Sequence, residues 1–266
     1  LADWNGLMIA ALVNAGLVLE EPGWLAMAKQ AFDFIAAKMT KGDRLGHSWR
    51  AGKLTFPGLA SDFAAMIRAA LALYEATGER TYLERALAWQ RAFDSHYADA
   101  DTGGYYLSAD DADDLLLRPH STVDDATPNP NAVAAQNLLR LAVLTGNDNW
   151  RTKADTLIEG ILSAAERNLF GHIALLTALD LRLRGAEIVA TGPQAEHFAQ
   201  AALRLPFLDR IVLRASSAAD LPASHPAQEK LKAATDSAAF ICVGERCSLP
   251  VGEPEQIAEV AKAMRS

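Results

Sequence analysis

Two aspartates, Asp3 and Asp62, are the carboxylates of this sequence best placed for general acid–base chemistry, because each lies at the start of a strongly apolar helical run. Hydrolysis of a glycosidic bond, or proton transfer at a sugar hydroxyl, uses two carboxyl groups about 5–10 Å apart, one with a raised pKa. The dipole at a helix start favours the charged carboxylate, which suits a base or nucleophile better than an acid. Asp3 and Asp62 are therefore candidate catalytic residues. Helix capping is the structural alternative for Asp62.

Aromatic, basic and amide side chains near the same helix starts could contact a small polar ligand. Two tryptophans, like Tyr105, could stack on a sugar ring, although aromatic residues at helix starts are more often core or staple residues. A histidine and an arginine lie on a long segment, and a long ordered loop often has a functional reason. The candidate ligand-binding residues are Trp4, Asn5, His47, Trp49, Arg50, Arg118, Asn129, Asn131 and His172.

Several of these candidates have equally simple structural interpretations. Asn129 or Asn131 could cap the helix that follows. Arg118 could reach an acidic group of a ligand, or pair with one of the aspartates in residues 110–114. His172 could be a structural histidine with satisfied hydrogen bonds. The sequence does not separate these alternatives.

Helices must position these residues, and two kinds of helix alternate along the chain. A helix that is apolar on all sides must be surrounded by protein, whereas an amphipathic one has a solvent face. The apolar runs cover residues 1–19, 62–74, 132–144 and 173–183, and the amphipathic ones residues 24–39, 81–93 and 150–165. Strict alternation predicts an inner and an outer layer of antiparallel helices, as in an α/α toroid. An irregular bundle or a helical-repeat solenoid is the alternative.

All inner helices of such a ring start at the same end. The residues that would then gather at one mouth of the central cavity are Asp3, Trp4, Asn5, Ser61, Asp62, Asn129, Pro130, Asn131 and His172. Backbone N–H groups at helix N-termini favour anions and hydroxyl-rich ligands. A ligand site is therefore expected at that mouth.

The segments between the helices show two other patterns. Residues 40–58 are expected to form a loop, and residues 101–107 and 115–118 two short strands around the acidic turn 110–114. From Gly185 onward, β-branched runs predict strands at 187–190, 210–213 and 238–243, with helices at 194–205 and 254–264. We expect two domains, a toroid part over residues 1–184 and a small α/β subdomain over residues 185–266.

Composition narrows the classes of function. The chain has 266 residues, half of them apolar, and a net charge of −8. Nucleic acid and anionic membranes need a basic face, so neither is an expected partner. No run reaches 18 uninterrupted apolar residues, so no membrane span is expected. No signal peptide can be read before the first helix, and we expect the chain to begin inside a structural unit.

The two cysteines, Cys242 and Cys247, are too few for a secreted disulfide scaffold, which favours a cytoplasmic location. Their C-x4-C spacing differs from a redox C-x2-C motif, and no nearby Cys or His pair completes a zinc site. Cys242 is expected to be an inert core residue. No cofactor and no metal are expected, since residues 185–192 also have too few glycines for a dinucleotide fingerprint.

Four stretches, which together span nearly the whole chain, are residues 3–12 (DWNGLMIAAL), 115–119 (LLLRP), 131–142 (NAVAAQNLLRLA) and 242–250 (CVGERCSLP). These stretches resemble the thioredoxin-domain proteins of the spermatogenesis-associated protein 20 type. Two elements depart from the family pattern: its usual Pro-Ser-Gly-Asn reads PNPN at 128–131, and its Glu/Asp-Asp-Tyr-Ala reads SDFA at 61–64.

This resemblance implies a toroid similar to six-hairpin glycosidases and N-acylglucosamine 2-epimerases, preceded in the full-length protein by a thioredoxin-like domain. On this view the chain is the C-terminal part of a longer protein, and a second copy could cover the exposed inner helices. An epimerase of this type would use histidines on inner helices as proton-transfer bases, for which only His47 and His172 are placed. The expected function is binding, and possible processing, of a sugar-like ligand. The alternative is a non-catalytic scaffold or client-binding module for the thioredoxin-like domain.

Overall fold

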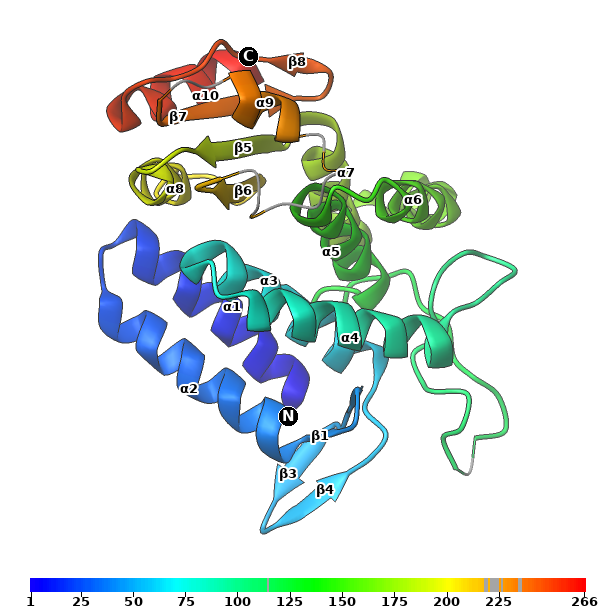
Figure 1. Ribbon diagram of the computed structural model, residues 1–266. Coiled ribbons are helices and arrows are strands. Elements are labelled where there is room, and N and C mark those ends of the chain that lie inside the picture. Colours follow the sequence, from blue (N-terminus) through cyan, green and yellow to red (C-terminus); the bar gives the residue numbers. More distant parts are fainter. Residues whose placement is uncertain (114, 218–219, 221–224, 226, 234–235) are drawn as a thin grey trace.

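The computed structural model describes the whole chain except residues 114, 218–219, 221–224, 226 and 234–235. Its first part consists of three helix hairpins and a final helix (Figure 1). The helices are α1 (Ala2–Val18), α2 (Pro22–Lys38), α3 (Ala60–Thr77), α4 (Arg80–Tyr97), α5 (Pro130–Thr145), α6 (Asn149–Arg167) and α7 (Ile173–Arg184). The turn within each hairpin is short, whereas the segments that join one hairpin to the next between α2 and α3 and between α4 and α5 are long. A short 3-10 helix, η1 (Leu169–His172), precedes α7.

These helices form the two predicted layers. In α3, 14 of 18 residues are buried, whereas α6 buries only five of its 19 residues. The inner helices pack in the order α1, α3, α5 and α7, and the outer helices α2, α4 and α6 each pack on the inner helix that precedes them. The described structure is thus mainly α, a partial α/α toroid of alternating inner and outer helices with a small C-terminal α/β part. This confirms the predicted fold class.

The first and last helices of the inner layer, α1 and α7, expose apolar side chains. Trp4 and Met8 of α1 are 62% and 58% exposed, and Ile173 and Leu183 of α7 are 51% and 65% exposed. Helix α1 packs on α2, α3 and α8 (Ala195–Leu203), while α7 packs on α5 and α6, and these apolar side chains of both helices stay exposed among the described residues. The first and last inner helices therefore both present apolar side chains to the surface.

The structure corrects the expectation of a plain loop over residues 40–58. Strands β1 (Thr40–Lys41) and β2 (Arg44–Leu45) form one short antiparallel hairpin, and β3 (Ser48–Arg50) and β4 (Lys53–Thr55) form another. The second hairpin turns through Ala51 and Gly52, both with positive φ. Two central residues with positive φ match the twist of hairpin strands.

The two short strands predicted at 101–107 and 115–118 are wrong. In the described residues between α4 and α5, the only β pairing is a single bridge from Ala98 to Tyr105. Side chains instead hold part of the backbone of this segment: Asn131 binds both polar groups of the Tyr105 backbone, and Arg118 donates to the Ser108 carbonyl. The predicted acidic turn 110–114 ends at residue 114, which lies outside the described residues.

The C-terminal part is a four-stranded sheet in the order β6-β5-β7-β8, seen at the top of Figure 1. Its strands are β5 (Ala186–Thr191), β6 (Arg210–Ala215), β7 (Ala238–Val243) and β8 (Arg246–Cys247). Strand β5 is parallel to β6 and antiparallel to β7. Helices α8 (Ala195–Leu203) and α10 (Ile257–Arg265) share a core with one face of the sheet. The three long strands and both helices confirm the predicted elements, whereas β8 and α9 (Ala227–Ala233) were not predicted.

The other face of the sheet packs on the helical part. Val189, Ile211, Leu213 and Phe240 belong to the same core as α3 and α5. Strand β6 lies against both of these helices, near their C-terminal ends. The sheet therefore covers the end of the inner layer opposite the predicted mouth.

The expectation that Cys242 is an inert core thiol is wrong, because Cys242 and Cys247 form a disulfide. The chain turns between β7 and β8 at Gly244 and Glu245, which brings the two cysteines into direct register. Directly opposed residues of an antiparallel pair have side chains close enough to bond. The spacing C-x4-C thus corresponds to a two-residue turn with one residue pair between the turn and the disulfide.

None of the described helices combines the length and apolar character needed to cross a membrane.

Candidate functional site

Asp62 lies in the first turn of α3 and links three segments at the start of the inner layer. One carboxylate oxygen accepts a hydrogen bond from the Asp3 backbone N–H at 2.9 Å, which ties α1 to α3. The other accepts from the Leu59 N–H at 2.7 Å and lies 2.9 Å from Nδ1 of His47. Asp62 is completely buried, so its carboxylate is held by protein groups on both oxygens.

His47 lies between β2 and β3 and remains partly accessible. Its side chain is 26% exposed, and its backbone carbonyl accepts a hydrogen bond from Ala2 at the start of α1. Because Nδ1 faces a carboxylate oxygen, it is the protonated nitrogen, which leaves Nε2 without a partner among the described residues. A buried carboxylate that fixes the tautomer of a histidine is a common arrangement for a proton-transfer group.

The electrostatics of the pair shift both groups in the same direction. The hydrogen bond to Asp62 raises the pKa of His47 above its ordinary value, although burial acts against it. Burial raises the pKa of Asp62, although its hydrogen bonds to His47 and to Leu59 oppose the rise. A histidine with a raised pKa carries a proton over more of the neutral pH range, so it can donate as well as accept one.

The starts of α1, α3 and α5 meet at two neighbouring depressions. A very small cavity of about 10 Å³, enough for one water, lies between Asp3, Ser61 and Pro130. Beside it, a groove of about 210 Å³ is lined by Leu59, Ser61, Leu107, Ser121, Val123, Asp125, Thr127, Pro128, Asn129 and Pro130. Hydroxyl, amide and carboxylate groups in this groove could hydrogen-bond a polar ligand.

Asn129 and Asn131 have structural hydrogen bonds that fix the start of α5. The side chain of Asn129 accepts from the Asn131 N–H, as an N-cap does, and donates to the carbonyls of Ser121 and Val123. The Asn131 side chain accepts from the Tyr105 N–H at 2.7 Å and donates to the Tyr105 carbonyl at 3.0 Å. Asn129 borders the groove, whereas Asn131 points toward the segment between α4 and α5.

His172 and Arg118 are also held by the protein. Nδ1 of His172 lies 2.7 Å from the Asn168 carbonyl, and Nε2 lies 3.2 Å from the Thr122 hydroxyl. The Arg118 guanidinium donates to the carbonyls of His96 and Ser108 and lies over the Tyr106 ring. Neither residue lines the two depressions, and their predicted ligand contacts stay predictions.

The remaining candidates lie on the surface near His47. Trp4 is exposed beside Asp3, and Asn5 donates to the Leu1 carbonyl. Trp49 makes an edge contact with Phe34 of α2, and Arg50 is exposed in β3. The sequence thus identified Asp62 and His47, which the fold brings together. It also placed Ser61 and Pro130 at the helix starts that border the groove, but it did not single out Thr127, which precedes the PNPN stretch at 128–131.

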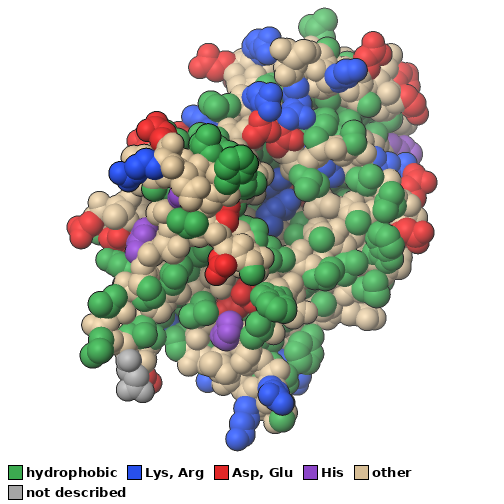
Figure 2. Space-filling model, turned by 180° about the vertical axis from the view of Figure 1, so that it is seen from behind, with side chains coloured by type: hydrophobic (Ala, Val, Ile, Leu, Met, Phe, Trp, Pro, Cys, Tyr) green, Lys and Arg blue, Asp and Glu red, His purple; other side chains and the backbone are tan. Residues whose placement is uncertain are grey.

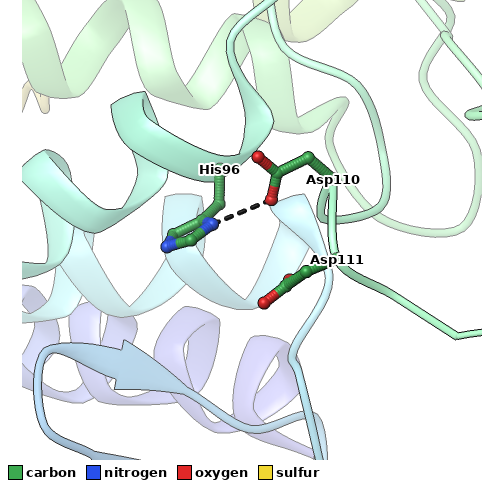
Figure 3. A group of neighbouring side chains, drawn as sticks. All are labelled: His96, Asp110 and Asp111. Carbon is green, nitrogen blue, oxygen red and sulfur yellow. Dashed lines mark hydrogen bonds and ion pairs between the residues drawn. The ribbon is translucent and has the colours of Figure 1, made fainter.

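One further group of possible metal ligands lies on the described surface away from this site. His96, Asp110 and Asp111 have ligand atoms within 4.8 Å of one another (Figure 3). His96 is paired with Asp110 at 2.8 Å, and Asp111 makes a two-bond ion pair with Arg44. These carboxylates therefore already have protein partners.

Several known proteins are similar in sequence to nearly the whole length of this chain. No family model matches the chain. Spermatogenesis-associated protein 20 of the rat is 29% identical over 96% of the chain, the human protein is 28% identical over 96%, and the mouse protein is 30% identical over 96%. The chain spans only 35% of the length of each of these relatives.

Solved structures with related helical arrangements are more distant. A family 76 α-mannanase of Bacteroides thetaiotaomicron gives a TM-score of 0.49 at 13% identity, covering 68% of this chain and 56% of its own. A cellobiose 2-epimerase of Bacillus thermoamylovorans gives a TM-score of 0.48 at 14% identity, covering 59% of this chain and 43% of its own. Over nearly its whole length the chain is thus homologous to about a third of spermatogenesis-associated protein 20, which confirms the resemblance predicted from its motifs.

Proposed function

We propose that the helix starts around Asp62 and His47 bind a small polar, sugar-like ligand, with His47 as the proton-transfer group. The observation that carries this proposal is the buried Asp62 carboxylate bound to Nδ1 of a partly exposed histidine. Asp62 was expected to act on the ligand itself. Its complete burial instead favours a positioning role, in which it orients His47 and stabilises the charged imidazole.

Three other features support a polar ligand at this place. The neighbouring groove carries Ser61, Ser121 and Asp125, whose oxygens can bind hydroxyl groups. Trp4 is exposed one residue after Asp3 and offers an aromatic face. Asp3 is the second carboxylate of the proposed site, because it borders the small cavity between the helix starts.

The test is ligand binding followed through the histidine ring. The chain has six histidines, so the ring signals of His47 can be assigned in NMR spectra by substitution. A panel of monosaccharides, disaccharides and sugar phosphates should shift the His47 signals at millimolar concentration or below. Asp62→Asn should weaken this binding and lower the pKa of His47, because the carboxylate that favours the imidazolium is lost.

The matched control is His197→Gln, because His197 is exposed on α8 and far along the chain from the site. This variant should bind like the unchanged protein. If no compound of the panel moves the His47 signals, the ligand proposal is wrong.

The second candidate is a non-catalytic scaffold for a thioredoxin-like domain or for another copy of the chain. The exposed apolar sides of α1 and α7 favour it, because contiguous exposed apolar side chains commonly mark interaction surfaces. Met8→Lys combined with Leu183→Lys should reduce concentration-dependent association in sedimentation experiments. Unchanged association in this double variant would count against these helix sides as the interface.

A further inference from the structure

Three arginines and one glutamate meet inside the molecule at the end of the inner layer opposite the helix starts. Arg68 and Glu75 come from α3, Arg140 from α5, and Arg210 from β6. All four line one small cavity together with Asn14 of α1 and apolar residues. Figure 2, a view from behind, shows Lys or Arg side chains in a hollow near the centre of the molecule.

Two of the arginines have strong protein partners. Arg140 donates to Glu75 at 3.0 Å and to the carbonyls of Arg210 and Leu208 at 2.7 and 2.8 Å. Arg210 donates to the carbonyls of Leu203 and Phe207. These bonds hold the strand and the two helices together, so both residues have a clear structural role.

Arg68 differs, because it has no hydrogen bond or ion pair to any described residue. Its Nη1 is buried without a partner, as are Nε of Arg140 and Nε of Arg210. Burial, with Arg140 nearby, lowers the pKa of Arg68 to about 9, which still leaves it charged at neutral pH. A buried guanidinium with unused donors is costly, unless a bound anion or water pairs with it.

The charges at this cavity do not balance. Three guanidinium groups face one carboxylate, which leaves an excess of two positive charges. The enclosed space is about 10 Å³, so a phosphate group bound here would place one oxygen atom in it and its other atoms outside it. A doubly charged oxyanion satisfies both the charge and the unused donors, and guanidinium groups match phosphate geometry well.

We propose that Arg68, with Arg140 and Arg210, binds a phosphate group at this cavity, either free phosphate or the phosphate end of a small metabolite. This site lies at the opposite end of the inner helices from the Asp62–His47 pair and does not depend on the function proposed there.

Thermal unfolding with inorganic phosphate at constant ionic strength tests the site. The melting temperature should rise saturably, by about 5–10 °C at a phosphate concentration 100-fold above Kd. Glucose 6-phosphate in a parallel titration distinguishes an ester from free phosphate, and either response supports the site. Chloride should give no saturable response, and an equal response to chloride would overturn the assignment to phosphate.

Arg68→Met separates the site from general salt effects, because phosphate also stabilises proteins by exclusion from their surface. The variant should lose the saturable rise and should melt higher than the unchanged protein in phosphate-free buffer, since an unpaired buried charge is removed. The matched control is Arg167→Met, an exposed arginine at the end of α6, which should respond like the unchanged protein.

A second variant, Arg68→Lys, distinguishes a loss of phosphate binding from a folding defect. It keeps the charge but loses the planar fork, so phosphate affinity should fall about tenfold or more while the fold is kept. Direct binding of phosphate by calorimetry to the unchanged protein gives an independent reading. An absence of phosphate binding there, or an equal saturable rise in Arg68→Met, would refute the proposal.

Discussion

Asp62 shows why residue type and chain position alone do not give a chemical role. Its place at a helix start suggested a base or a cap, and the structure gives it a capping hydrogen bond from Leu59 and a histidine partner at once. The sequence pointed separately to Asp62 and to His47. Their pairing depends on the path of residues 40–58, whose hairpins leave no clear signature in so short a segment.

The Asp62–His47 pair should make stability depend on pH. The pKa of His47 is raised in the folded chain, so its contribution is fully present below the pKa of an unfolded histidine and is lost as pH rises through the folded value. The pKa of Asp62 is also raised, so its ionisation lowers stability at a more acidic pH. In denaturant titrations above about pH 6.5, the unchanged protein should lose stability with rising pH.

His47→Gln should remove this dependence, because glutamine does not titrate. His197→Gln, in which an exposed histidine is replaced, is expected to keep the slope of the unchanged protein. Identical pH slopes for His47→Gln and the unchanged protein would show that the pair contributes nothing to stability.

At the scale of elements, the hydrophobic period predicted the helices and the long strands well. Burial on all sides, as in α3 and α5, is visible in composition alone. The segment between α4 and α5 was predicted less well, because side chains bind some of its backbone groups in place of a neighbouring strand. The amides of Asn131 and the guanidinium of Arg118 take the place of a strand ladder, and no local pattern shows this.

Asn131 is therefore expected to hold that segment against α5. Asn131→Ala would leave the buried polar groups of Tyr105 without partners, at a cost of about 2–3 kcal/mol in the free energy of unfolding. Asn5→Ala, at an exposed position of α1, should change stability by less than about 0.5 kcal/mol. Urea titrations measure both. Equal effects of the two substitutions on the free energy of unfolding would contradict the proposed role of Asn131 in holding this segment.

For the whole molecule, two layers of helices and a sheet were predictable, but the contact between them was not. The proposed division at Gly185 separates two chain segments whose cores meet through the inner face of the sheet. Val189, Ile211, Leu213 and Phe240 each contribute about 1.5–3 kcal/mol by burial there. A division in sequence therefore does not imply two units that fold alone.

Residues 1–184 expressed alone should be much less stable than the whole chain. Removing the sheet uncovers the ends of α3 and α5, and we expect the melting temperature of the helical part to fall by about 10 °C or more. Removal of α10 alone, which packs on the outer face of the sheet, should leave the melting of the helical part little changed. A fragment 1–184 that melts like the whole chain would instead establish two independent domains.

The bonds between the helices and β6 have one more consequence. Strand β6 lies at the border of the sheet, where unpaired backbone groups can pair with strands of other molecules. Here the Val212 N–H donates to Glu75 at 3.0 Å, and the Arg210 carbonyl accepts from Arg140 at 2.7 Å. Two helical side chains thus occupy the edge that would otherwise be a template for aggregation. The helical part therefore protects this edge of the sheet from pairing with other strands.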